Sequence, residues 1–220
     1  MAVKKQFQNL YYKLYAKFPL KFDYLFELEK NLKNCNSILD VGCGSNSPLR
    51  HVSKVDYCVG VDIFEPWMNK SENNKIHNKY YKLDVLKLDS AFTEKSFDCV
   101  VALDLLEHFT KEEGNKLLKI VEKIAKQKVI VFTTNGYNPQ HESDNNPWNV
   151  HKSGWTVSEM EQKGYQVIGI NGLKILKGEY GLLKFRPKFI WFVVTIVTQF
   201  LVRNHPKRAF QILCVKEIKE

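Results

Sequence analysis

The chain has 220 residues, of which 44% are hydrophobic and 26% charged, and its formal net charge is +9 at pH 7. This composition fits one well-packed domain, with or without an appendage, and it excludes an intrinsically disordered chain. The basic surplus is compatible with a nucleic acid, an anionic membrane surface or an acidic substrate, and equally with solubility alone.

The N-terminal part of the chain predicts helices. Through residues 1–36 hydrophobic residues recur at spacings of three and four, and Pro19 marks a break between two helices. The segment lacks the short apolar core of a signal peptide. We expect residues 1–36 to form a helical cap on a domain that spans residues 37–220.

From residue 37 onward, short apolar runs of strand character alternate with helical patterns, as in residues 112–126. Five runs of this kind precede residue 135: SILDVG (37–42), YCVGVD (57–62), YYKLDV (80–85), FDCVVALD (97–104) and KVIVFTT (128–134). Strands that alternate with helices predict right-handed crossovers and a doubly wound, mostly parallel α/β sheet.

The last third of the chain is less regular. Residues 135–155 predict a long loop, because they are rich in Asn, Pro and Gly. A short helix over 156–165 and two further strands, QVIGI (166–170) and AFQILCVKEI (209–218), complete the pattern. Residues 171–208 between these two strands form a long, basic insertion in which Glu179 is the one acid.

The insertion contains an apolar run, FIWFVVTIVTQFLV, at residues 189–202. It is shorter than the roughly 20 residues that a membrane-spanning helix requires. Because it is apolar nearly all round, we expect it to pack on the sheet or to form a lid over an acceptor site. A peripheral contact with an anionic membrane is the alternative.

The five cysteines indicate neither a disulfide framework nor a metal site. None forms a C-x-x-C pair, and no His/Cys cluster has zinc spacing. Cys58, Cys99 and Cys214 lie in apolar stretches, as small core residues do. We therefore expect reduced thiols, no metal ion and a cytoplasmic protein.

The turn after the first strand is suited to a small ligand. Gly42 and Gly44 let a ligand approach the backbone beyond the carboxyl end of a parallel strand. Asp62 ends the second strand and can accept hydrogen bonds from a ribose diol, and Asp84 can accept one from an exocyclic amine. A dinucleotide fits less well, because Ser47 replaces the third glycine of G-x-G-x-x-G, and a Walker loop is excluded.

Together these segments resemble the class I S-adenosylmethionine-dependent methyltransferases of the small-molecule type. The resemblance rests on LDVGCG, VGVDIFE, LDVLKL and FDCVVALDLLEHF, in this order, and covers residues 37–134. It implies a Rossmann-like sheet of seven strands with an antiparallel last strand, and S-adenosylmethionine as cofactor. The loop at residues 45–48 departs from the family pattern, in which many members have a glycine or an alanine.

The resemblance also implies which residues contact each part of the cofactor. The implied contacts are Asp40, Gly42, Cys43 and Gly44 for the methionine part, Asp62 for the ribose, Ile63, Asp84 and Val85 for the adenine, and Asp104 and Leu105 near the sulfonium.

Methyl transfer from a sulfonium requires alignment of the nucleophile and, for a weak nucleophile, a base. His108 and His151 are the candidate bases, and for each a structural role is the alternative. Four aromatic or amide residues of the long loop either wall the acceptor pocket or pin the loop to the sheet: Tyr137, Gln140, Trp148 and Trp155.

We expect transfer of a methyl group to an oxygen or nitrogen atom of a small-molecule, saccharide or lipid-linked acceptor. The alternatives are an RNA or protein methyltransferase, and a non-catalytic module that binds the cofactor or docks on a membrane. Nucleic acid ranks low because no RNA-binding module is recognisable. The sequence does not define the oligomeric state.

Overall fold

The computed structural model describes residues 23–219, apart from 53–54, 143–144 and 179–180. The break predicted at Pro19 and the helix predicted before it lie outside the described residues. In the described part, residues 23–36 contain one helix, α2 (Tyr24–Leu32), whose N-cap Asp23 accepts a hydrogen bond from the Phe26 amide.

A sheet of seven strands, in the order β3-β2-β1-β4-β5-β7-β6, forms the centre of the described chain. The strands are β1 (Ser37–Val41), β2 (Tyr57–Asp62), β3 (Lys79–Lys82), β4 (Phe97–Leu103), β5 (Ala125–Thr134), β6 (Gln166–Leu173) and β7 (Ala209–Glu217). The last strand, β7, is antiparallel to both of its neighbours, and the pairs among β1 to β5 are parallel. The predicted fold class is confirmed.

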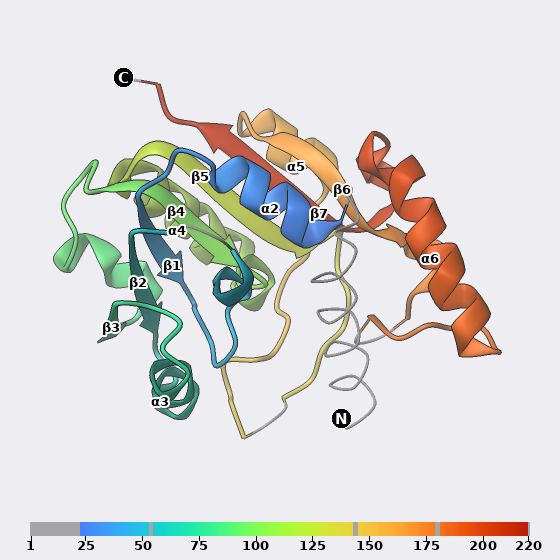
Figure 1. Ribbon diagram of the computed structural model, residues 1–220, viewed down its shortest axis with the longest axis horizontal. Helices are drawn as coiled ribbons and strands as arrows, with labels where there is room; N and C mark the ends of the chain where they lie inside the picture. The colour runs from blue at the N-terminus through green and yellow to red at the C-terminus, as the bar shows by residue number, and fades with distance from the viewer. Residues whose placement is uncertain (1–22, 53–54, 143–144, 179–180, 220) are drawn as a thin grey trace.

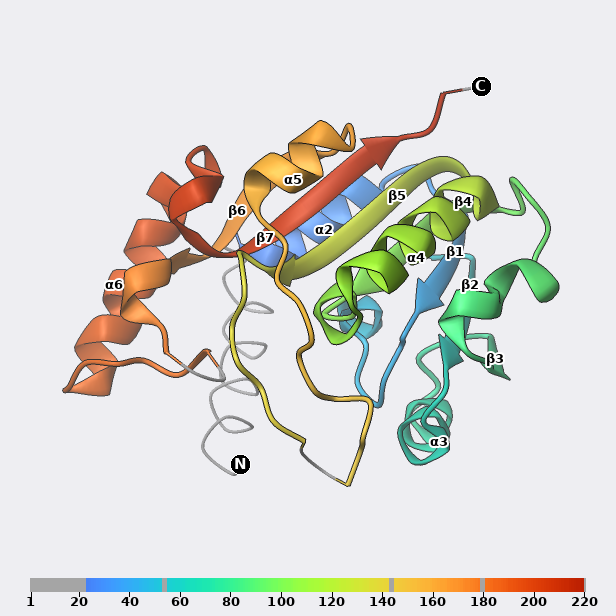
Figure 2. The same ribbon diagram turned by 180° about the vertical axis from the view of Figure 1, so that it is seen from behind.

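Helices cover both faces of this sheet. The longer helices are α2, α3 (Glu65–Asn73), α4 (Lys111–Ile124), α5 (Val157–Gln162) and α6 (Lys188–Arg203), and the 3₁₀ turns are η1 (Pro48–His51), η2 (Val85–Ser90), η3 (Leu106–His108), η4 (Lys174–Leu176) and η6 (Pro206–Arg208). Helix α2 lies on the face seen in Figure 1, and α4 and α5 lie on the face seen in Figure 2.

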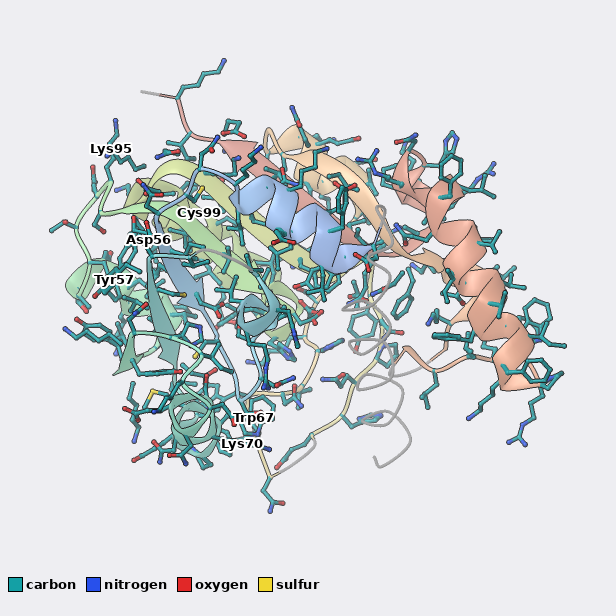
Figure 3. All side chains as sticks on the ribbon, viewed as in Figure 1. Asp56, Tyr57, Trp67, Lys70, Lys95 and Cys99 are labelled. Atoms are coloured by element: carbon teal, nitrogen blue, oxygen red, sulfur yellow. The ribbon has the colours of Figure 1, made fainter. Side chains whose placement is uncertain are left out.

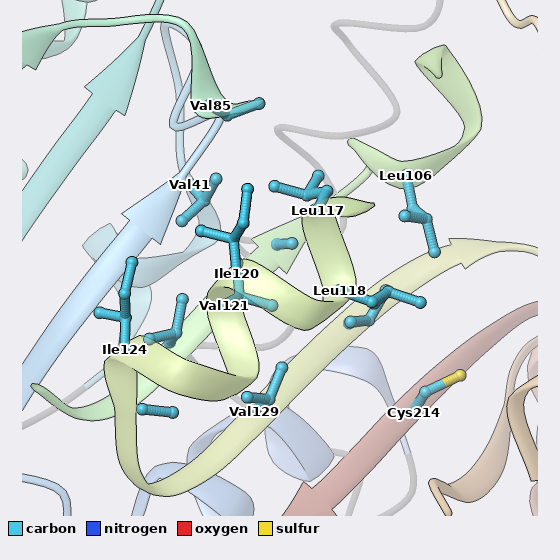
Figure 4. Close-up of a cluster of buried hydrophobic side chains, with 14 of the residues drawn as sticks. Val41, Val85, Leu106, Leu117, Leu118, Ile120, Val121, Ile124, Val129 and Cys214 are labelled. Carbon is cyan, nitrogen blue, oxygen red and sulfur yellow. The ribbon is translucent and has the colours of Figure 1, made fainter. Parts of the chain in front are cut away.

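The main core lies between α4 and the sheet. Leu117, Val121 and Ile124 of α4 are fully or almost fully buried and pack against strand residues such as Val41 and Val129 (Figure 4). A capping box fixes the start of α4, since the Thr110 and Glu113 side chains each bond the other residue's amide. This core holds the strand ends that carry the candidate site.

Helix α6 has an arrangement that the sequence analysis did not predict. Its buried residues include Thr195, Thr198 and Gln199, whereas six large apolar residues face outward: Phe189, Ile190, Val193, Val197, Phe200 and Leu201. The expectation that the apolar run is buried is therefore wrong for these side chains.

The edge strand β6 explains this orientation. Gln199 donates to the Gly169 carbonyl oxygen (3.0 Å) and accepts from the Gly172 amide (3.1 Å). Thr198 accepts from the Leu173 amide at 3.4 Å. Polar groups at the edge of a sheet need partners, so the polar side of α6 turns inward. No helix among the described residues is long and apolar enough to cross a membrane.

Candidate active site

The turn that follows β1 is shaped by two glycines in the left-handed region. Gly42 has φ +69° and Gly44 has φ +56°. The amides of Gly42 and Cys43 both donate to the Val61 carbonyl oxygen, at 2.8 and 3.0 Å, which ties the turn to β2. A Cβ on Gly42 would lie 2.5 Å from Leu105 Cδ1, so the leucine side chain would have to shift, and φ +69° itself favours glycine.

Asp62, at the end of β2, holds this turn closed. Its Oδ2 accepts from the Gly44 amide and its Oδ1 from the Phe64 amide, both at 2.8 Å. Burial raises the pKa of this carboxyl, although the backbone amides act in the opposite direction. Each carboxylate oxygen can accept a second hydrogen bond, so Asp62 retains capacity for ligand hydroxyls.

Asp40 lies beneath the turn, in a buried polar network. Its Oδ2 accepts from Ser47 Oγ at 2.5 Å and lies 2.8 Å from His77 Nε2. Ser47 Oγ also accepts from the Leu49 amide at 3.2 Å and thereby caps η1. The departure at residues 45–48 therefore supplies a hydroxyl that braces the loop, and Asp40 is only 1% exposed.

A residue that the sequence analysis missed, Trp67 of α3, lies at the mouth of the turn. Trp67 Cε3 lies 3.8 Å from the place that a Cβ would take on Gly44. In the described part of the chain no other atom outside the turn lies within 4 Å of that place, so a ligand can approach there. Figure 3 shows Trp67 on α3, at the end of the sheet to which the β1 arrow points. An aromatic residue five positions after a strand-terminal acid was the available signal.

The Cys43 thiol is buried inside the turn. Burial, together with the neighbouring carboxylates of Asp40 and Asp62, raises its pKa strongly. The thiol therefore stays protonated, and Cys43 can offer a ligand its backbone amide but no thiolate. All five cysteines are free and buried.

Asp84 and Val85 follow β3, which ends three residues earlier than the predicted strand. Asp84 Oδ1 accepts from the Leu86 amide at 3.0 Å and caps η2. The Val85 side chain packs in the main core. After β3, the Asp84 carboxylate therefore lies beside the backbone at the start of η2.

Asp104 follows β4 with φ +52°, and its side chain is exposed. Its amide donates to the Phe132 carbonyl oxygen at 2.8 Å, and its Oδ1 accepts from Gln211 Nε2 at 2.9 Å. The half-buried Leu105 next to it covers Gly42. These contacts place the β4 end against the glycine turn.

The structure brings the two candidate histidines together. The rings of His108 and His151 have centroids 4.9 Å apart. His108 Nδ1 lies 3.1 Å from the Val150 carbonyl oxygen, and His151 Nδ1 lies 2.6 Å from the Asn138 carbonyl oxygen. A carbonyl oxygen only accepts, so Nδ1 of His108 carries the proton and Nε2 is its basic nitrogen. Burial lowers the pKa of His108, which keeps the ring neutral near pH 7.

Glu107, next to His108, is a second residue that the sequence analysis did not single out. Its side chain is 1% exposed and its Oε2 accepts from Thr133 Oγ1 at 2.8 Å. Its backbone oxygen accepts from the amides of Lys152 (2.9 Å) and Ser153 (3.1 Å). Burial raises the pKa of the carboxyl to about 7. Glu107 thus fastens the loop that carries His151.

The long loop has exposed and buried parts. Tyr137 and Trp148 are 58% and 52% exposed, and Gln140 bridges the loop by donating to the Asn149 backbone oxygen at 3.1 Å. Trp155 is different, because it is 1% exposed, packs in the main core and donates to the Leu106 carbonyl oxygen at 3.3 Å. The buried Trp155 side chain anchors the loop and lines no open surface. Of the two roles expected for it, pinning the loop to the sheet therefore fits, and lining an acceptor pocket does not.

Among the residues that the structure describes, no group of three or more His, Cys, Asp or Glu side chains could hold a metal ion. The candidate site consists of a glycine turn, acids at or just after the ends of β2, β3 and β4, and a histidine pair.

Comparison with known proteins agrees with this geometry. Residues 39–133 match the family model described as a methyltransferase domain. No curated protein sequence matches the chain.

The fold is shared with several solved structures. A SAM-dependent methyltransferase from Archaeoglobus fulgidus is 19% identical with a TM-score of 0.54, and the match covers 92% of this chain and 99% of that one. The YcgJ protein from Bacillus subtilis is 16% identical with a TM-score of 0.56, covering 89% and 98%. The methyltransferase domain of bacterial CtHen1-C is 15% identical with a TM-score of 0.56, covering 89% and 97%.

Residues 39–133 thus form a methyltransferase domain, and the fold around it is one that solved S-adenosylmethionine-dependent methyltransferases share. The resemblance found in the sequence is confirmed, together with the enzyme class and the cofactor that it implies. The open approach at Gly44 and the remaining acceptor capacity of Asp62 fit an adenosyl ligand. An enzyme of this class acts on a small-molecule or macromolecular acceptor.

Proposed function

We propose that the enzyme transfers a methyl group to an oxygen or nitrogen atom of a small-molecule, saccharide or lipid-linked acceptor. The observation that carries this proposal is the pair His108 and His151, which lies next to the end of β4, where Leu105 covers the glycine turn. When bound, S-adenosylmethionine supplies an already activated methyl group, so the protein contributes alignment and proton removal.

We assign the cofactor to the carboxyl edge of the sheet. The backbone of the glycine turn faces the methionine part, and Asp62 accepts hydrogen bonds from the ribose. Asp40 acts indirectly, because its carboxylate braces the turn from below. The remaining assigned contacts are Gly42, Cys43, Gly44, Ile63, Trp67, Asp84, Val85, Asp104 and Leu105.

We assign His108 as the base for an acceptor hydroxyl or protonated amine. Its Nδ1 is held by the Val150 carbonyl oxygen and its lowered pKa leaves Nε2 unprotonated near neutral pH. His151 lies within ring contact and supports it. The exposed Tyr137 and Trp148, with Gln140 between them in the sequence, form the acceptor side of the site.

The test begins with a screen of acceptor pools with a methyl-labelled donor, followed by the variant His108→Gln. We expect turnover on the acceptor to fall by about 10²–10⁴-fold, with the affinity for S-adenosylhomocysteine unchanged. Activity of the unaltered enzyme should persist to a pH below the ordinary pKa of histidine before it falls, because burial lowers the pKa of His108. His205→Gln, at an exposed histidine after α6, is the matched control.

Three outcomes would contradict the proposal. Full activity of His108→Gln would remove the assigned base. Label that enters only RNA or protein, with salt-sensitive binding, would support a macromolecular acceptor instead. Tight binding of S-adenosylhomocysteine without turnover on any acceptor would indicate a non-catalytic module.

A further inference from the structure

The outer side of α6 is an exposed apolar surface. Phe189, Val197 and Phe200 are each more than 60% exposed, and Ile190, Val193 and Leu201 are between 45% and 56% exposed. Figure 3 shows side chains of α6 projecting away from the sheet, at the edge of the molecule beyond β6. Contiguous apolar surface of this kind marks an interaction site more often than scattered residues do.

The apolar surface continues into the segment before α6. Ile175, Leu182 and Phe185 are exposed as well, and the Phe185 ring contacts Trp191 of α6 at a centroid distance of 4.8 Å. We define the α6 face as Ile175, Leu182 and Phe185 together with the six exposed apolar residues of α6. Because the polar side of α6 bonds β6 through Gln199, the α6 face cannot turn inward without losing those bonds.

Cations flank the α6 face along the chain. Five exposed lysines and arginines lie before, at the start of or after α6: Lys184, Arg186, Lys188, Lys207 and Arg208. Lys174 instead donates to the Asn135 backbone oxygen. No acidic residue lies between residues 174 and 208 in the part of the insertion that the structure describes, and Glu179 is the one acid in that stretch of sequence. The partner of this surface must therefore be both apolar and anionic.

Charge decides among the partners. A second copy of the chain carries a net charge of +9, so the cations that flank the α6 face would repel it. They would also repel residues 1–22, which contain five lysines and no acid. An anionic lipid surface complements the α6 face, because cations meet the headgroups while the apolar side chains enter the acyl boundary. A helix of 16 residues is about 24 Å long and can lie flat in that interface.

We propose that the α6 face docks the enzyme on anionic lipid membranes as a peripheral protein. The proposal rests on the surface alone and does not depend on which acceptor is methylated.

The test is sedimentation of the full chain with phosphatidylcholine vesicles that contain or lack phosphatidylglycerol. We expect binding to the anionic vesicles and at least ~10-fold weaker binding to the neutral ones. The double variant Val197→Glu/Leu201→Glu should lose at least ~10-fold of the binding, because it places charges in the apolar contact. Lys184→Gln/Arg186→Gln/Lys188→Gln should weaken binding by roughly 10²-fold, at about 1 kcal/mol per cation.

Tyr57→Glu provides the matched control. Tyr57 is also exposed, at 43%, but it lies on β2 at the opposite side of the molecule (Figure 3). It should bind vesicles as the unaltered chain does. All variants should keep their melting temperature and their affinity for S-adenosylhomocysteine, which separates this test from that of the proposed function.

Four results would overturn the proposal. In the first, the full chain does not bind anionic vesicles. In the second, the α6 face variants bind them as tightly as the unaltered chain does. In the third, sedimentation velocity shows a dimer that Val197→Glu/Leu201→Glu dissociates. The fourth is a loss of melting temperature in that variant, which would show that residues of the chain itself cover the face.

Discussion

Asp40 and Asp62 stand near the ends of adjacent strands, yet their carboxylates act on opposite sides of the glycine turn. Asp62 holds the Gly44 and Phe64 amides at the ligand side, whereas Asp40 binds Ser47 and lies against His77 below the turn. The residue type does not distinguish the two aspartates. Only the depth of each side chain separates the proposed ligand contact, Asp62, from the brace, Asp40.

Gly42→Ala should destabilise the fold. A Cβ there would lie 2.5 Å from Leu105 Cδ1, and φ +69° strains any residue with a side chain. We expect a loss of about 1–2 kcal/mol in urea unfolding, because the left-handed backbone disfavours a side chain. Gly178→Ala is the control, because its Cβ would find only ordinary contacts of 3.4 Å and above. Equal stability of the two variants would refute the role of Gly42.

The buried carboxyl of Glu107 should make the free energy of unfolding depend on pH. Burial raises its pKa from 4.5 to about 7, so the folded state binds a proton that the unfolded state has lost between these values. The free energy of unfolding should therefore fall, relative to Glu107→Gln, as the pH rises from about 4.5 to about 7. The difference should be on the order of 2 kcal/mol. Contributions of other groups, including His108, largely cancel in this comparison.

The measurement is chemical unfolding of both proteins at a series of pH values. A constant difference in unfolding free energy across pH 4.5–7 would show that Glu107 is ionised throughout in the folded protein.

At the scale of elements, α6 and β6 stabilise each other through polar contacts. Gly169 lies so close to α6 that a Cβ would be 2.0 Å from the Val202 carbonyl oxygen. This approach places Gln199 within hydrogen-bond distance of two backbone groups of β6. The helix is therefore fixed by its polar side.

Gln199→Leu should cost about 1–3 kcal/mol in unfolding free energy, because the Gly169 carbonyl and the Gly172 amide would lose their partner. Val197→Gln, two residues earlier on the outer side, should be nearly neutral. Thermal and urea unfolding of both variants measure the difference. A larger loss for Val197→Gln would indicate that the helix packs through its apolar side instead.

The sequence predicted where helices and strands occur better than it predicted which side of a helix is buried. The helical pattern predicted for residues 112–126 corresponds to α4, in which Leu117, Leu118, Val121 and Ile124 are all buried. The same logic failed for α6, because composition does not reveal that an edge strand has backbone groups to satisfy. Trp67 and Glu107 were missed for a related reason: their roles arise from distant contacts.

At the scale of the whole molecule, the alternation of strands and helices determined the topology. The parallel strands place Asp62 at the end of β2, and Asp84 and Asp104 just after β3 and β4, at one edge of the sheet. In the described chain, α2 packs through Leu25 and Leu28 on the same sheet that carries the site. The division between a cap and a domain at residue 36 stays a prediction.

The central claim is that this edge binds the adenosyl cofactor through Asp62, and calorimetry with S-adenosylhomocysteine tests it directly. Asp98→Ala is the matched control, because Asp98 also accepts from two backbone amides, those of Asn36 and Ser37, but at the opposite end of β1. We predict that Asp62→Ala weakens binding at least ~10-fold while Asp98→Ala binds as the unaltered chain does. Equal affinity of Asp62→Ala and the unaltered chain, or no binding by the latter, would contradict the account.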